Sequence, residues 1–146
     1  MHRVQQIVNA AAGLIAANAS LRATVEVNRV RSLADEQPDS PCVTVNYGGD
    51  VPDEAQDQRD IASAVEILLT AYAFGDSETD VLQSLLDMRT QTHVALMADM
   101  TLGLSFVWET RYGGAEPPQL QQAERVCGAQ SSRWTVRYLM DASTPE

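Results

Sequence analysis

Lysine is absent from this 146-residue sequence, so all ten of its basic side chains are arginine. This absence excludes the Walker-type phosphate loop and enzymes that form a Schiff base on lysine, because both need that amine. His2 and His93 lie far apart, and no serine has the flanking glycines of a nucleophile elbow. Metal sites need clustered ligands at fixed spacing. We therefore expect no catalytic residue, no metal and no cofactor.

Cysteine is too scarce for a disulfide framework. Cys42 and Cys127 lie in apolar, strand-like surroundings, so we expect buried thiols in a reducing compartment, although a single bridge between them stays open. No segment approaches the roughly 20 apolar residues that a membrane span needs. The first residues also lack the basic start and continuous apolar run of a signal peptide. We expect the protein to be made and used in the cytoplasm, or in something assembled there, and we expect no membrane partner.

Acidic residues outnumber basic ones by twenty to ten, which gives a net charge of −10. Because nucleic-acid affinity depends on basic residues that neutralise phosphates, this balance argues against DNA or RNA as a direct partner. One interpretation of the acidic excess is solubility alone. The other is a surface that contacts a basic protein face, or that lines a path which DNA crosses without binding.

Helical and strand-like patterns alternate along the chain. Apolar residues at three- and four-residue spacing predict an amphipathic helix over 4–18. The segment Ser77-Glu-Thr-Asp80 is typical of a helix N-terminus, and it precedes an apolar pattern that fits a helix of about 20 residues. Alternation predicts strands over 24–31, 42–47, 61–74, 102–108 and 133–140. The segment 61–74 would also suit a helix, and Gly48-Gly49 is expected to end the second strand.

This order of elements predicts the fold class. Helix, three strands, helix and two strands favour an α+β fold, in which two main helices pack on one face of a mixed or antiparallel β-sheet. We see no internal repeat and no domain boundary, so residues 1–146 are expected to form one domain. Residues 34–41, 50–60 and 113–118 are predicted to be loops because Pro, Gly, Asp and Ser gather there.

The segment 50–60 is strongly acidic. It could be imagined to bind calcium, but it lacks the central glycine and the alternating ligands of an EF-hand loop. It is then either a solvated loop or a loop that docks onto another protein. We name five residues as the candidate docking loop: Asp50, Asp53, Glu54, Asp57 and Asp60.

Arginines and tryptophans supply the remaining candidates. Arg29 and Arg31 are one strand period apart, so both guanidinium groups would point to the same side and could pair with carboxylates across a subunit interface. A solvated face is the alternative. Trp108 and Trp134 lie within apolar alternations and are predicted to be in the core, although tryptophan also anchors interfaces. His93 is predicted to be partly buried on the second helix.

Several local patterns resemble the lambda-type tail terminator family of long-tailed bacteriophages. A proline-led strand and small turn occur at Ser40-Pro-Cys-Val-Thr-Val-Asn-Tyr-Gly-Gly-Asp50, and an acidic loop follows. Next come the strand Ser63-Ala-Val-Glu-Ile-Leu-Leu-Thr-Ala-Tyr-Ala-Phe74 and the helix start at Ser77-Glu-Thr-Asp80. The last pattern is Ser132-Arg-Trp-Thr-Val-Arg-Tyr138, which is similar to the family's final strand. The resemblance runs from about residue 4 to residue 140.

The resemblance implies a structural virion protein without catalytic activity. Six copies would form a ring on the end of the tail tube, contact the tail tube protein and stop its polymerisation. The other side of the ring would join the connector or completion protein of the head neck. DNA would pass through the lumen without specific binding. The protein would thus sit at the head–tail junction of the virion.

Two other functions remain open. The chain could be another neck component, either a head–tail connector or a tail tube subunit. It could also be a small α+β enzyme, which would require convergent titratable residues in a pocket. The resemblance favours the terminator, and the scarcity of histidine, lysine and clustered ligands argues against the enzyme.

Overall fold

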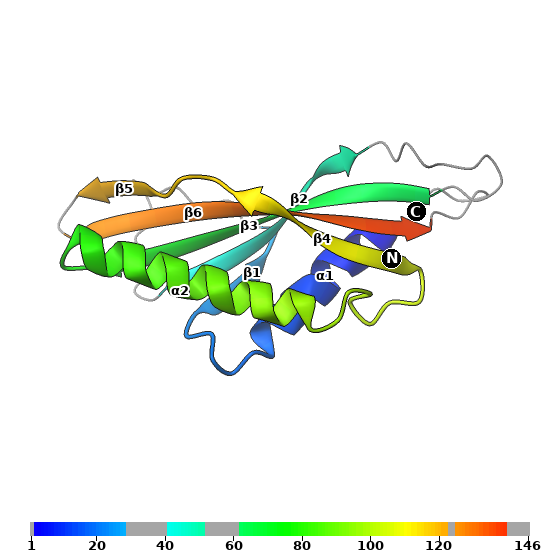
Figure 1. The fold of residues 1–146 in the computed structure, drawn as a ribbon, viewed down its shortest axis with the longest axis horizontal. Helices are drawn as coiled ribbons and strands as arrows, with labels where there is room; N and C mark the ends of the chain where they lie inside the picture. Colours follow the sequence, from blue (N-terminus) through cyan, green and yellow to red (C-terminus); the bar gives the residue numbers. More distant parts are fainter. Residues whose placement is uncertain (1, 29–40, 52–61, 123–124, 140–146) are drawn as a thin grey trace.

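The computed structural model describes residues 2–28, 41–51, 62–122 and 125–139. They form two helices and six strands (Figure 1). In chain order the elements are α1 (Arg3–Ala16), β1 (Thr24–Val27), β2 (Cys42–Val51), β3 (Ala62–Gly75), α2 (Glu78–Met97), β4 (Val107–Ala115), β5 (Gln119–Gln122) and β6 (Val126–Leu139).

The strands form one mixed sheet in the order β1-β2-β3-β6-β4, and β5 also pairs with β6. Strand β1 is parallel to β2, whereas the other pairs are antiparallel. The long strands β3 and β6 pair over their whole length, from Ala62 opposite Leu139 to Gly75 opposite Val126. This central pair organises the sheet, and β1, β4 and β5 are its edges among the described strands.

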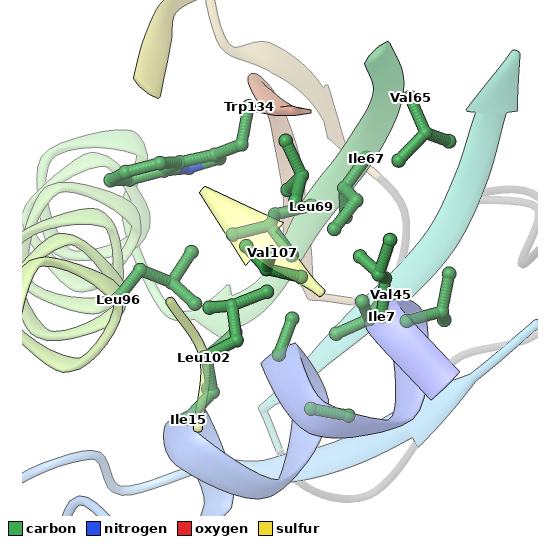
Figure 2. Close-up of a cluster of buried hydrophobic side chains, with 14 of the residues drawn as sticks. Ile7, Ile15, Val45, Val65, Ile67, Leu69, Leu96, Leu102, Val107 and Trp134 are labelled. Carbon is green, nitrogen blue, oxygen red and sulfur yellow. The ribbon is translucent and has the colours of Figure 1, made fainter. Parts of the chain in front are cut away.

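Both helices pack against the same face of the sheet (Figure 1). Side chains alternate along a strand, so Val65, Ile67 and Leu69 of β3 all point to that face. Figure 2 shows these side chains meeting Ile7 of α1 and Leu96 of α2. Burial of each large apolar side chain contributes about 1.5–3 kcal/mol. The predicted α+β class, the mixed sheet and the shared helix face are confirmed.

The helix starts follow from their capping residues. The Ser77 hydroxyl accepts a hydrogen bond of 3.2 Å from the backbone N–H of Asp80, as the sequence predicted. Acidic Glu78 and Asp80 lie in the first turn, where they oppose the helix dipole. At α1, the ring of His2 accepts from the N–H of Val4. Both predicted helices are therefore confirmed, with α1 ending two residues earlier than expected.

A second, smaller cluster joins the N-terminal half of α2 to the sheet. It includes Val81, Leu85, Val43 and Ala73. Gly128 of β6 allows this close approach, because a Cβ there would lie 2.6 Å from Cγ1 of Val81 and 3.0 Å from Cδ1 of Leu85. Real Cβ atoms essentially never make contacts below 3.0 Å, so any side chain at this position would force its neighbours to shift.

The prediction of a strand over 102–108 is wrong for 102–106, because β4 begins only at Val107. Leu102 has a φ of 55°, and the residues before β4 form hydrogen-bonded turns. These turns still direct three apolar side chains toward the core, those of Leu102, Leu104 and Phe106. Their alternating pattern in the sequence therefore does not indicate a strand. The prediction that Trp108 is in the core is also wrong: it lies at a bulge of β4 and is 44% exposed. Trp134 is buried as predicted.

Three strand boundaries also differ from the prediction. The pair Gly48-Gly49 does not end β2, because a bulge between Tyr47 and Gly49 lets pairing continue to Val51. The expected loop 113–118 contains the end of β4, and β5 starts directly after it at Gln119. Strand β6 begins seven residues before the predicted start at Arg133. In each case a neighbouring strand supplies hydrogen bonds that the sequence pattern does not reveal.

Candidate docking surface

Helix α2 carries an exposed apolar stripe as well as a buried one. Leu85, Met88 and Leu96 face the core. Leu86, Val94 and Met97 lie on the outer side, where Val94 is 56% exposed. Exposed apolar side chains that gather on one face are typical of contact surfaces. The apolar pattern of this helix therefore divides between its two sides, because Leu86 and Met97 lie on the exposed side.

A groove of about 410 Å³ lies between α2 and the edge strand β4. Its apolar wall comes from Leu86 and Val94, and Tyr112 of β4 forms the opposite wall. Three polar residues of α2 complete the lining: Arg89, Thr90 and His93. The volume falls in the range of about 300–1,000 Å³ found for ligand pockets, so one or two side chains of a partner fit.

Aromatic rings fix the floor of this groove. The rings of His93, Tyr112 and Trp134 contact one another with centroids 5.1–5.2 Å apart, and the His93–Tyr112 pair is edge-to-face. Trp134 is buried and reaches from the sheet toward α2 (Figure 2). His93 is half-buried, as the sequence predicted. Because the three rings support one another, the floor is preformed.

Arg89 supplies the positive charge of the groove. Its guanidinium carbon lies 6.0 Å from the centroid of the Tyr112 ring. Within the described parts of the chain, no carboxylate pairs with this guanidinium. That is notable in a chain with a twofold excess of acids. An arginine over an aromatic ring is favoured at protein interfaces, where its planar group binds carboxylates.

The outer edge of β4 borders this groove. Among the described strands, β4 pairs with β6 alone. Register shifts interrupt it between Val107 and Glu109 and between Tyr112 and Ala115. Such bulges twist an edge and hinder indiscriminate strand pairing. We therefore expect contacts here to use side chains of the groove more than a new backbone ladder.

The opposite face of the sheet balances its charges internally. Arg133 pairs with Glu66 and Glu116 at 3.6 and 2.8 Å. Glu109 pairs with Arg111 at 3.0 Å and with Arg137 at 3.2 Å. Arg137 also lies 5.4 Å from the centroid of exposed Trp108. Surface pairs stabilise the fold little, by about 0–1 kcal/mol each. On this face they set three arginines against three glutamates.

The predicted site residues are only partly placed. Asp50 is exposed near the end of β2, on the strand, and not in a loop. The other predicted site residues lie outside the described residues: Asp53, Glu54, Asp57 and Asp60 of the acidic segment, and Arg29 and Arg31. The expected strand over 24–31 is described as β1 only to Val27. The structure thus tests neither the docking role of the acidic segment nor the interface role of the two arginines.

Sequence reasoning missed the groove residues. His93 was considered only as a structural residue, and Arg89, Val94 and Tyr112 were not singled out. The available signal was Val94, an apolar residue outside the buried stripe of α2. The pairing of this stripe with Tyr112 depends on how α2 crosses the sheet, which sequence spacing does not specify.

Other features bear on function more weakly. Cys42 and Cys127 are buried thiols, as predicted, and they are not joined in a disulfide. Across the described ranges, no three His, Cys, Asp or Glu residues come together in a way that could hold a metal ion. The helices in those ranges include none that is long and apolar enough to cross a membrane.

Comparison with known proteins gives little further information. No family model matches the sequence, and no curated protein matches it either. Among solved structures, this chain is similar to a chain in a structure described as "Virion of native gene transfer agent (GTA) particle". The alignment covers 93% of this chain and 91% of the other, with a TM-score of 0.47 and 10% sequence identity.

Proposed function

We propose that this protein is a structural virion subunit that acts as a tail terminator. In this role a ring of copies caps the tail tube, stops its polymerisation and presents a surface to the head neck. The proposal rests on the terminator-like segments of the sequence together with one structural observation. That observation is the preformed α2/β4 groove, which combines exposed apolar side chains with Arg89, a cation that has no ion pair with the described residues, and so supports a function in protein docking.

A cap is physically necessary in a tube of this kind. Each tube ring presents the same surface to the next ring, so heterologous stacking does not close by itself. A terminator must cover that surface with one side and present a different surface with the other. The sheet offers such a difference: the helix-covered side has the apolar groove, whereas the other side has charge-balanced ion pairs.

The net charge suits the same role. DNA must cross the ring during ejection, and a subunit with a charge of −10 repels phosphates. A head–tail connector or a tube subunit would meet the same requirement, so charge alone does not separate the three functions. Tail length separates them, because only a terminator determines where the tube stops.

The decisive experiment uses a phage from which the gene for this protein has been deleted. We expect electron micrographs of its lysates to show overlong tubes that fail to join heads, and we expect the protein supplied during assembly to restore normal length. An Arg22→Asp variant, changed at an exposed residue away from the groove, serves as a complementation control. Tails of normal length in the deletion mutant would refute the terminator and favour the connector.

A further inference from the structure

We propose that Tyr47 and Asp50 of one copy dock into the α2/β4 groove of the next copy, where Asp50 pairs with Arg89. This inference rests on the ring of the proposed function and identifies the contact that would close it. The occupant of the groove is thus a second copy of this chain. The proposal follows from where the Tyr47/Asp50 pair and the α2/β4 groove lie on one sheet, and from the complementary chemistry of these two surfaces.

The two surfaces lie at opposite ends of one row across the sheet. Tyr47 of β2 pairs with Ile67 of β3, and Ile67 pairs with Trp134 of β6. Trp134 in turn pairs with Tyr112 of β4, which forms a wall of the groove. A neighbour placed beside the sheet along this row therefore brings its Tyr47 toward Tyr112 of the first copy.

Tyr47 and Asp50 form an exposed pair on β2. Tyr47 is 46% exposed, and Asp50 is exposed beside it on the helix-covered face. Desolvation and a hydrogen bond with Asp50 raise the pKa of the Tyr47 hydroxyl above its usual value. The bulge at Gly49, which has a φ of 115°, brings the two residues together. An exposed aromatic ring next to a carboxylate is the chemistry of an interface anchor.

The groove offers matching groups. Leu86 and Val94 provide apolar surface for a tyrosine ring, and the rings of Tyr112 and His93 provide aromatic contacts. Arg89 provides the cation for a carboxylate and has no ion pair with the described residues. Desolvated arginine–carboxylate pairs are strong and orient their partners. The single cation of the groove and the carboxylate of Asp50 complement each other.

Head-to-tail contact is favoured over a two-fold dimer through the groove. If two grooves met face to face, Arg89 would approach Arg89, and like charges at an interface are strongly unfavourable. A contact between different surfaces leaves one free surface of each kind on every pair of copies. Such contacts propagate beyond two copies, and they form a ring where the rotation between neighbours closes, as the proposed function requires.

The test uses charge reversal at the two proposed partners. In Asp50→Arg and Arg89→Asp, the contact brings like charges together, so we expect each variant alone to associate about a hundredfold more weakly or worse. An equimolar mixture of the two variants restores opposite charges at every contact, but only when copies alternate. We therefore expect native mass spectrometry of the mixture to show rings with even numbers of copies.

Arg22→Asp is the matched control for Arg89→Asp. It makes the same change from a positive to a negative charge, at an exposed residue outside the groove lining. It should associate like the wild type. Circular dichroism of each variant checks that the exposed substitutions preserve the fold. Single variants that assemble normally would overturn the proposal, and so would a mixture that stays monomeric.

The experiment also separates this inference from the proposed function. If the wild type forms rings and limits tail length while Asp50→Arg and Arg89→Asp behave like it, the docking contact is wrong and the terminator function stands. If the wild type forms no ring at high concentration or in intact tails, the proposed ring fails and the contact fails with it.

Discussion

Trp134 links the core to the docking surface at the scale of a single residue. Its side chain is 1% exposed and contacts the rings of His93 and Tyr112. We expect Trp134→Ala to lower the free energy of unfolding by about 3–5 kcal/mol, because it leaves a cavity under α2. Urea denaturation measures the change. Trp108→Ala is the control: Trp108 is exposed, so a loss as large as that of Trp134→Ala would contradict the assignment.

Gly128 lies where α2 packs closely on the sheet. An added Cβ would meet Val81 at 2.6 Å and Leu120 at 2.8 Å. We expect Gly128→Ala to destabilise the protein by about 1–3 kcal/mol through overpacking. Gly13→Ala makes the same change at an open position of α1 and should stabilise by about 0.5–1 kcal/mol. Thermal melts that shift both variants in the same direction would count against this packing.

At the scale of elements, α2 depends on its N-terminal cap. Ser77 accepts a hydrogen bond from the N–H of Asp80. We expect Ser77→Ala to cost about 1 kcal/mol, because that amide loses its partner, whereas Ser77→Asp should preserve stability. Chemical denaturation of the two variants gives the comparison. Equal losses in both would show that the hydroxyl is not the stabilising group.

Helices and strands that bury only one face could be predicted from the sequence. Alternation in 61–74 identified β3, and the helical spacing of Ile7, Val8, Ala11 and Ile15 identified α1, because each element buries one face. Strand β5 and the first half of β6 were missed. Their residues are largely Gln, Ser, Ala and Gly, which carry no apolar pattern. Pairing with β3 and β5 makes these segments strands, and single-sequence patterns do not contain that information.

The candidate site was harder to predict than the fold. Asp50 was chosen for its acidic neighbours, and the structure instead places it beside exposed Tyr47 at the end of β2. The groove combines residues from α2 with Tyr112 of β4. Which helix residues face β4 depends on the crossing of α2 over the sheet. That crossing is set by close packing at positions such as Gly128, and its angle does not follow from periodicity.

At the scale of the whole molecule, charge determines what the protein avoids. We expect no binding of DNA at physiological salt, because a chain with a charge of −10 releases few counterions from phosphates. Fluorescence anisotropy with labelled duplex and single-stranded DNA measures this, with a basic DNA-binding protein as the positive control. Micromolar affinity would contradict the prediction and would indicate a basic face built from the ten arginines.

The pairing of β3 with β6 has a consequence for synthesis on the ribosome. Strand β3 leaves the ribosome well before β6, because α2, β4 and β5 are translated between them. At about 5–20 residues per second, its apolar central edge waits on the order of seconds for its partner. Non-local pairing of this kind also slows folding. The nascent chain therefore passes through an interval in which β3 is exposed to other chains, and we expect chaperone occupancy of ribosome-bound chains to peak before β6 emerges.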